Sequence, residues 1–165
     1  MKRKIFNNMV YIAVVAVLIT TTLLGMFTYY RYMEQVKSGI KDEAAYLAAS
    51  LNVKDNQNLN KYKNITVSRI TRVDQNGKVI YDSSGKEKSM GNHKNRTEIK
   101  EAYEKGQGED TRMSNTLRKQ TYYYAVRLKD GTILRMSRET QTIIKQMEDI
   151  IPIIMLMLAV VTILS

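Results

Sequence analysis

The sequence contains no cysteine, a single proline and a single histidine in its 165 residues. Without cysteine, the chain forms no disulfide and offers no thiolate metal site. His93 is the only histidine, and no Ser/His/Asp arrangement can be recognised around it from sequence spacing. A metal site would have to combine His93 with Glu98 or Asp82. The alternative is that His93 fixes its loop by hydrogen bonds. We therefore expect no catalytic, cofactor-binding or metal-binding residue in this chain.

Charge is missing from two apolar runs, one near each end of the chain. Residues 9–30 carry no charged side chain, and a helix of that length crosses ~30 Å of hydrocarbon. Residues 150–164 are equally uncharged but are fewer than the ~20 that a full span needs. We predict one transmembrane helix at residues 9–30 and a second, truncated one at residues 150–165. A soluble core helix is the alternative for the second run, but it would normally show a polar face.

Three basic residues, Lys2, Arg3 and Lys4, precede the first run with no acid among them. The positive-inside rule places this end in the cytoplasm, so residues 31–149 would lie outside a bacterial cell membrane that the chain crosses twice. A cleaved signal peptide is the alternative. It is disfavoured because the run exceeds the ~7–15 residues of a typical signal peptide and lacks an Ala-x-Ala site.

The net charge of +10 does not indicate a nucleic-acid partner, because most of the basic residues lie in the segment predicted to be outside the cell. A basic exterior could attract anionic wall polymers weakly. The alternative is an ordinary solvated surface.

Between the two runs, the periodicity changes from helical to strand-like. Apolar residues recur at three- and four-residue steps from Met33 to Leu51, which predicts an amphipathic helix that continues the first span. Residues 52–63 are polar and predict a loop. Asn76-Gly77 and Asp130-Gly131 are favoured two-residue hairpin turns. The predicted strands, in chain order, are residues 65–74, 78–82, 109–115, 121–128 and 132–138.

A short helix is predicted between the second and third strands. Residues 86–95 are polar and predict an irregular segment. Asn95 can then cap a helix in which Glu98 reaches back in a capping-box arrangement, and Gly106 ends that helix. A further helix at residues 140–149 would run into the second span.

This order of elements predicts an α+β fold, a PAS-like five-stranded antiparallel sheet with a long N-terminal helix, flanked by two transmembrane helices. The predicted domains are a cytoplasmic N-terminus at residues 1–8, the first transmembrane helix at 9–30, the extracytoplasmic PAS-like domain at 31–149 and the second transmembrane helix at 150–165.

Several segments match a known family in their order and spacing. They are Ile70-Thr-Arg-Val-Asp-Gln-Asn-Gly-Lys-Val-Ile-Tyr-Asp-Ser83, Met90-Gly-Asn-His-Lys-Asn-Arg-Thr-Glu-Ile99, Gly106-Gln-Gly-Glu109, Arg112-Met-Ser114, Tyr122-Tyr-Tyr-Ala125 and Leu134-Arg-Met-Ser-Arg138. Together they resemble the extracytoplasmic domain of phosphate-regulon-type (PhoR-like) sensor histidine kinases. The resemblance covers about residues 5–164 and departs from the family at Thr97, where proline is usual.

The resemblance implies a homodimeric membrane receptor of a two-component system. A HAMP linker and a histidine kinase core that uses ATP and Mg would follow the second span and phosphorylate a response regulator. The phosphoacceptor histidine would lie there too, so this fragment itself carries no kinase chemistry.

Arg96, Arg112 and Arg135 are the candidate ligand-binding residues, with Tyr124 as an aromatic neighbour. Converging arginines bind carboxylate or phosphate in bidentate fashion. The alternative is structural: the arginines would pair with Asp82, Glu98 or backbone carbonyls, and the tyrosines would belong to the core. The ligand could be a small anion, a wall polymer or a protein.

We therefore expect a sensor module in which an external stimulus shifts the helix at residues 140–149 relative to the helix from Met33 to Leu51. Two other functions stay open. One is a membrane-anchored extracytoplasmic binding or adaptor protein without a kinase. The other is the sensor region of a chemotaxis or cyclic-dinucleotide receptor.

Overall fold

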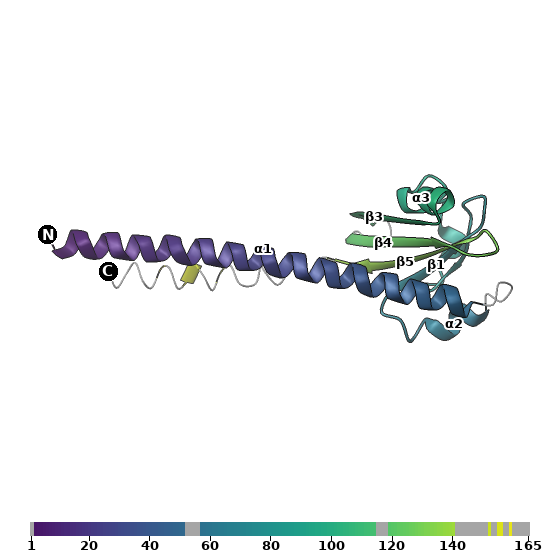
Figure 1. Ribbon diagram of the computed structural model, residues 1–165, viewed down its shortest axis with the longest axis horizontal. Helices are drawn as coiled ribbons and strands as arrows, with labels where there is room; N and C mark the ends of the chain where they lie inside the picture. Colours follow the sequence, from purple (N-terminus) through teal and green to yellow (C-terminus); the bar gives the residue numbers. More distant parts are fainter. Residues whose placement is uncertain are drawn as a thin grey trace. The chain divides into compact units, whose positions relative to one another are not determined.

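The computed structural model describes residues 2–51, 57–114 and 119–140, together with residues 152, 155, 156 and 159 (Figure 1). The chain divides into two units, Met1–Glu34 with Gln141–Ser165, and Gln35–Thr140. The helix predicted at residues 140–149 and the second span predicted at residues 150–165 lie almost entirely outside the described residues, so both stay predictions.

Helix α1 spans Lys2–Ser50 and contains the apolar run predicted as the first membrane span. It is long and apolar enough to cross a membrane, and its most apolar stretch is not buried against other parts of the protein. Thr20 and Thr28 donate their hydroxyl hydrogens to the carbonyl oxygens of Ala16 and Leu24, both at 2.8 Å. These polar groups are therefore satisfied within the helix, as hydrocarbon surroundings require.

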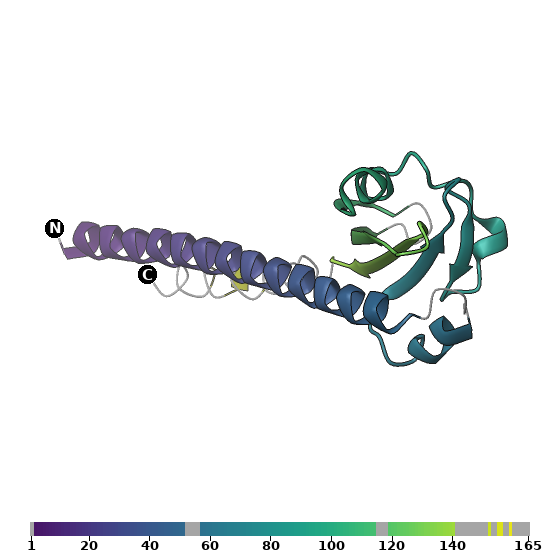
Figure 2. The same cartoon turned by 45° about the vertical axis from the view of Figure 1, so that its right-hand side comes forward.

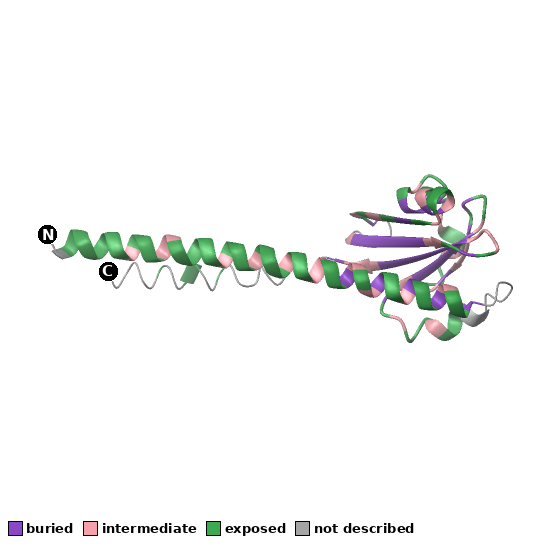
Figure 3. Cartoon of the chain, in the orientation of Figure 1, coloured by how far each residue is buried: buried purple, intermediate pink, exposed green. Residues whose placement is uncertain are grey.

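The part of α1 that belongs to the second unit has one apolar face. Its buried residues recur at three- and four-residue steps, as the purple stripe in Figure 3 shows, and they are Val36, Ile40, Ala44 and Leu47, followed by Leu51. The amphipathic helix predicted from Met33 to Leu51 is confirmed to within one residue, since α1 ends at Ser50.

Helix α2, Gln57–Tyr62, corrects the prediction of a loop over residues 52–63. The segment is polar except for Leu59, whose side chain is completely buried. A single apolar residue gives no measurable periodicity, so the sequence pattern could not reveal this short helix. Residues 52–56 of the predicted loop lie outside the described residues.

The predicted five-stranded antiparallel sheet is confirmed, and its strand order is β2-β1-β5-β4-β3. The chain forms β1 and β2 at one edge of the sheet and then passes through a helix to β3 at the other edge. It continues through β4 to β5, which lies in the centre. The strands are β1 Arg69–Val73, β2 Val79–Asp82, β3 Gln107–Met113, β4 Gln120–Arg127 and β5 Ile133–Glu139, with a one-turn 3₁₀ helix, η1 Glu87–Ser89, after β2.

Both predicted hairpins are present, but each is closed by a three-residue loop, residues 75–77 and 129–131, and not by the predicted two-residue turn. At Asn76-Gly77, the N–H of Asp74 donates to the carbonyl of Lys78 at 2.9 Å, and Gly77 has φ of 84°, a value that glycine adopts without strain. At Asp130-Gly131, the N–H of Leu128 donates to the carbonyl of Thr132 at 2.8 Å.

Helices α1 and α3 lie on opposite faces of the sheet (Figures 1 and 2). Tyr122 and Tyr124 of β4 face α1, where the ammonium nitrogens of Lys37 and Lys41 lie 5.8 and 5.6 Å from their respective ring centroids. Ala125 faces α3. Because successive residues of β4 are buried on both sides, the strand has no polar face despite its alternating periodicity.

Helix α3, Thr97–Lys105, begins differently from the prediction. Arg96, not Asn95, precedes the first helical residue, and no side chain caps this end of the helix. Glu98 does not reach back to the helix start, because its side chain is completely buried under the helix. The predicted end at Gly106 is confirmed, with the Gly106 N–H donating to the carbonyl of Ala102 at 3.0 Å.

Candidate functional site

The sheet face that α3 covers changes from apolar to polar along its strands. One end packs apolar side chains of four strands against Ile99 and Ala102 of α3. Two residues from Val73 and Ile133, the register pairs Thr71 with Arg135, and Arg135 also lies opposite Ala125 of β4. Tyr123 follows on the same face of β4, two residues from Ala125. The polar end lies next to the loop that leads into α3. The strands therefore place buried polar side chains where the helix does not cover the sheet.

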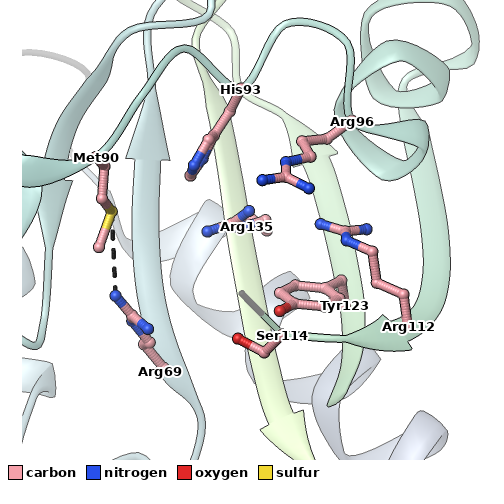
Figure 4. Close-up of a pocket in the computed structure, with 8 residues that line it drawn as sticks. All are labelled: Arg69, Met90, His93, Arg96, Arg112, Ser114, Tyr123 and Arg135. Atoms are coloured by element: carbon pink, nitrogen blue, oxygen red, sulfur yellow. Dashed lines mark hydrogen bonds between the residues drawn. The ribbon is translucent and has the colours of Figure 1, made fainter. Parts of the chain in front are cut away.

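A small pocket, open to solvent, lies at this polar end (Figure 4). Four of its lining residues are arginines, and none is an acid. The lining comprises Arg69 of β1, Met90, His93 and Arg96 of the loop before α3, Arg112 and Ser114 of β3 and the residue after it, Tyr123 of β4, and Arg135 of β5.

Glu98 is the buried carboxylate that holds two of these arginines. It accepts hydrogen bonds of 2.6 and 2.8 Å from the two terminal nitrogens of Arg112, and one of 3.3 Å from Arg135. Burial acts to raise the pKa of Glu98, but the hydrogen bonds from Arg112 and the charge of Arg135 outweigh it and lower the pKa. Arg112 also contacts Asp110. The predicted structural role of pairing with Glu98 is thus present for Arg112 and Arg135.

Arg135 lies at the floor of the pocket, with 5% of its surface exposed. Among the described residues, it donates besides Glu98 only to the hydroxyl of Thr71, at 3.3 Å, and its Nε finds no hydrogen-bond partner there. The Tyr123 ring lies 5.2 Å from the Arg135 guanidinium and 4.1 Å from that of Arg112. Burial lowers the pKa of Arg135 while Glu98 opposes the change, and a guanidinium stays charged in either case.

Arg69 at the pocket edge pairs with a second buried acid, Asp82, and also donates to Ser84 and contacts the sulfur of Met90. Its Nε and Nη2 contact the Asp82 carboxylate at 3.1 and 2.9 Å, and Thr71 donates to the same carboxylate at 2.9 Å. Burial acts to raise the pKa of Asp82, but the hydrogen bonds from Arg69 and Ser84 outweigh it and lower the pKa. Because Thr71 also accepts from Arg135, the two ion pairs form one network across β1 and β5.

His93 is buried in the pocket wall. Its backbone N–H donates to the carbonyl of Gly77 at 2.7 Å, which ties the loop to the first hairpin. Its Nδ1 is buried without a partner. Burial and the charges of Arg135 and Arg96 lower the pKa of His93 to about 4, so the ring is neutral near pH 7. In the described part of the chain, no group of three acids or histidines could hold a metal ion.

The structure brings together three of the four predicted ligand-binding residues. Arg96, Arg112 and Arg135 line one pocket. The backbone of Arg96 bonds to His93 and to α3, while its guanidinium makes no hydrogen bond or ion pair with another described residue. Tyr124 does not line this pocket: it lies on the opposite face of the sheet, where its hydroxyl donates to Gln107 at 2.7 Å. Tyr123 lines the pocket instead, because neighbouring strand residues point to opposite faces.

Comparison with known families identifies this domain. The sequence profile of the single Cache-like family matches residues 30–133, more than half of the chain. The chain belongs to the single Cache-like family. Domains of this family are extracellular sensor modules of signalling receptors. The match includes most of the amphipathic part of α1, helix α3 and the first four strands of the sheet.

Among solved structures, the Bacillus subtilis YkuI protein is similar to this chain. That crystal structure is described as having an EAL domain and as a complex with the substrate c-di-GMP and calcium. The identity is 16%, the TM-score is 0.47, and the match covers 73% of this chain and 35% of that one. The single Cache-like chain thus spans about a third of the protein that it resembles. No curated protein sequence matches it.

The pocket of this single Cache-like domain is suited to binding and positioning, because its polar groups are donors held in place by buried acids. Sequence reasoning missed five lining residues, namely Arg69, Met90, His93, Ser114 and Tyr123. Four of them lie in segments that also carry the family resemblance. Their convergence depends on the strand register, which no local pattern reveals.

Proposed function

We propose that this chain is the sensing and membrane-anchoring region of a bacterial sensor histidine kinase of the phosphate-regulon type. Membership of the single Cache-like family supports the sensing role. The ordered segments from Ile70 to Arg138 that resemble phosphate-regulon-type kinases support the output. The observation that carries the proposal is the continuity of α1, a single helix from Lys2 to Ser50.

This continuity gives a physical route for a signal. The same helix contains the apolar run at residues 9–30 and the buried stripe from Val36 to Leu47 that packs in the sensor unit. Helices transmit small rotations or translations along their length, since their backbone hydrogen bonds resist deformation. A stimulus that repacks the sensor unit would therefore shift α1, and residues 140–149 would move relative to it.

In this proposal the receptor is a homodimer that crosses the membrane twice. A HAMP linker and a kinase core, with ATP and Mg, follow on the cytoplasmic side and phosphorylate a response regulator. The shift of α1 relative to residues 140–149 would change the balance between an active and an inactive state of the kinase. The coding sequence after Ser165 tests the output directly: a HAMP-like helix pair and a His-Glu-x-x-x-Pro helix support a kinase, and a stop codon within a few codons supports an adaptor.

The orientation can be tested by cysteine labelling, since the native chain has no cysteine. Lys100→Cys places a thiol on the exposed side of α3, and Lys4→Cys places one before the apolar run. A membrane-impermeant maleimide should label the first variant in intact cells and the second only after permeabilisation. Labelling of Lys4→Cys but not Lys100→Cys in intact cells would reverse the orientation and exclude an extracellular sensor.

A further inference from the structure

Three large apolar side chains near the end of α1 are exposed on the sensor unit. Tyr46 is 66% exposed, Ile65 75% and Val67 80%. Among the described residues of this unit, Met113 is the only other large apolar residue that is exposed. Single exposed apolar residues are ordinary on a protein surface, whereas a contiguous group marks a surface that another molecule covers.

The segment after α2 holds these side chains together. The rings of Tyr46 and Tyr62 meet edge to face, with their centroids 6.4 Å apart, so the end of α2 is attached to α1. Ser68 is the second attachment, because it accepts from the same Arg138 nitrogen that donates to α1. Figures 1 and 2 show α2 and this segment beside the end of α1. The exposed residues of the segment lie between the two attachments, and together with Tyr46 and Tyr62 they form what we call the apolar patch.

Charges of opposite sign flank the apolar patch. Asp42 lies one turn before Tyr46 on the same side of α1, and Lys61 and Lys63 precede and follow Tyr62 in the sequence. All three charged side chains are exposed, and none forms an ion pair with another described residue. The surface is therefore acidic on its α1 side and basic on its α2 side.

We propose that the apolar patch binds the same patch of a second copy of this chain, with Asp42 of each copy next to Lys61 and Lys63 of the other. The inference rests on the homodimer proposed above and names the surface that joins its two sensor units. A two-fold axis brings each side of a surface against the opposite side of its copy. A surface that is acidic on one side and basic on the other is therefore complementary to itself, and its apolar centre loses contact with water.

A second copy fits this surface better than a lipid headgroup layer does. An anionic bilayer surface attracts Lys61 and Lys63 but repels Asp42, and it offers no cation to that carboxylate. In the proposed receptor, both copies also enter one membrane through α1. Like segments of the two units then lie at like distances from the bilayer, which is the condition for a two-fold axis that runs along α1.

Membrane anchoring contributes to this association, because the patch is small. A stable interface buries ~800 Å² on each partner, more than these few side chains expose. Two chains held in one bilayer meet at a high effective concentration, so a weak contact between their sensor units suffices. A weak contact can also separate without unfolding either unit, which suits a receptor that alternates between two states.

Förster transfer between two dye-labelled populations of the whole chain, reconstituted together in phosphatidylcholine vesicles, measures the association. Both populations carry the dye at Lys100→Cys, the only thiol in the chain. Val67→Asp should weaken association by about tenfold or more, because it places a charge in the apolar centre. Val67 is largely exposed, so the fold tolerates the change. Thr111→Asp, at an exposed position of β3, is the matched control and should change association by less than about twofold.

Charge exchange tests whether the partner is a second copy. Asp42→Lys places like charges together twice in each dimer and should weaken association by about fivefold. Lys61→Asp combined with Lys63→Asp should weaken it by a similar factor. The triple variant with all three substitutions restores opposite charges across the interface and should associate within about twofold of the native chain. Contact of this surface with another part of the chain does not predict that recovery.

Three results would overturn the inference. They are an association that Val67→Asp leaves unchanged, an equal loss in Val67→Asp and Thr111→Asp, and a triple variant that does not recover. Absence of energy transfer at every protein-to-lipid ratio would overturn it as well. Dimers that persist in Val67→Asp would leave the proposed homodimer intact and exclude only this surface. The labelling test of orientation and the search for a downstream kinase do not depend on these measurements, so the two failures are distinguishable.

Discussion

Arg138 at the end of β5 donates a hydrogen bond of 2.7 Å to Glu43 of α1, which lies 95 residues earlier in the chain. The same guanidinium nitrogen donates to the hydroxyl of Ser68 at 2.9 Å, just before β1. The interaction therefore joins the central strand of the sheet to the helix that continues into the apolar run. It is a point at which a change in the sheet can reach α1.

The first prediction concerns this link. Glu43→Gln and Arg138→Gln should each destabilise the sensor unit, and a double-mutant cycle should give a coupling of ~1 kcal/mol, since both side chains are only about a quarter exposed. Urea unfolding of the chain in micelles, followed by tyrosine fluorescence, measures the four stabilities. Additive effects of the two substitutions would show that the pair does not couple helix and sheet.

The second prediction concerns the packing of α1 on the sheet. Ile40 is completely buried, so Ile40→Asp places a charge without a partner in the core and should lower the free energy of unfolding by ~3 kcal/mol or more. Ser38→Asp, at an exposed position of the same helix, should change it by less than ~0.5 kcal/mol. The same unfolding assay compares them. A full-length receptor with Ile40→Asp that still dimerises and responds to its stimulus would contradict signal transfer through α1.

The main elements of the fold could be predicted because their signals are local. The apolar run and the stripe from Val36 to Leu47 follow helical periodicity, and the turn at Asn76-Gly77 marks the first hairpin. Helix α2 could not be found, because only Leu59 is apolar and buried in it. The strand order, with β5 at the centre, follows from pairings between distant segments that no window of sequence contains.

The candidate site was predictable only in part. Arg96, Arg112 and Arg135 were candidates because converging arginines bind anions, and all three line the pocket. Tyr123 lines the pocket and Tyr124 does not, because periodicity distinguishes the two faces of a strand but does not say which face holds the pocket. Glu98 was misassigned to a helix cap because its spacing from Asn95 fits that motif, whereas its partners lie 14 and 37 residues later.

The third prediction concerns the close approach of β3 to α3. A Cβ on Gly108 would lie 2.4 Å from the carbonyl oxygen of Glu98 and 2.6 Å from Cβ of Glu101, so Gly108→Ala must push strand and helix apart. We expect a loss of ~1–3 kcal/mol, the usual cost of overpacking. Gly91→Ala, whose Cβ would meet no atom within 4 Å, is the matched control and should be near neutral. Thermal unfolding followed by circular dichroism compares the two, and equal melting temperatures would contradict the packing of α3 on β3.

The fourth prediction concerns the pH dependence of stability. His93 has a pKa of about 4 in the folded protein, against 6.5 for a free side chain, because burial and the charges of Arg135, Arg96 and Arg112 disfavour its cation more than Glu98 favours it. Between these values the unfolded chain binds more protons than the folded one. His93 therefore contributes stability above pH 6.5 that is lost as the pH falls toward 4.

The window from pH 6.5 to pH 5 isolates this effect, since the buried acids have lowered pKa values and titrate at lower pH. Stability should fall there with a slope approaching ~1.4 kcal/mol per pH unit. His93→Gln removes the only histidine and should flatten the slope in that window while leaving the steeper loss below pH 4.5. Urea unfolding at half-unit steps of pH measures both curves. A native slope that persists in His93→Gln would show that His93 is not a buried neutral group.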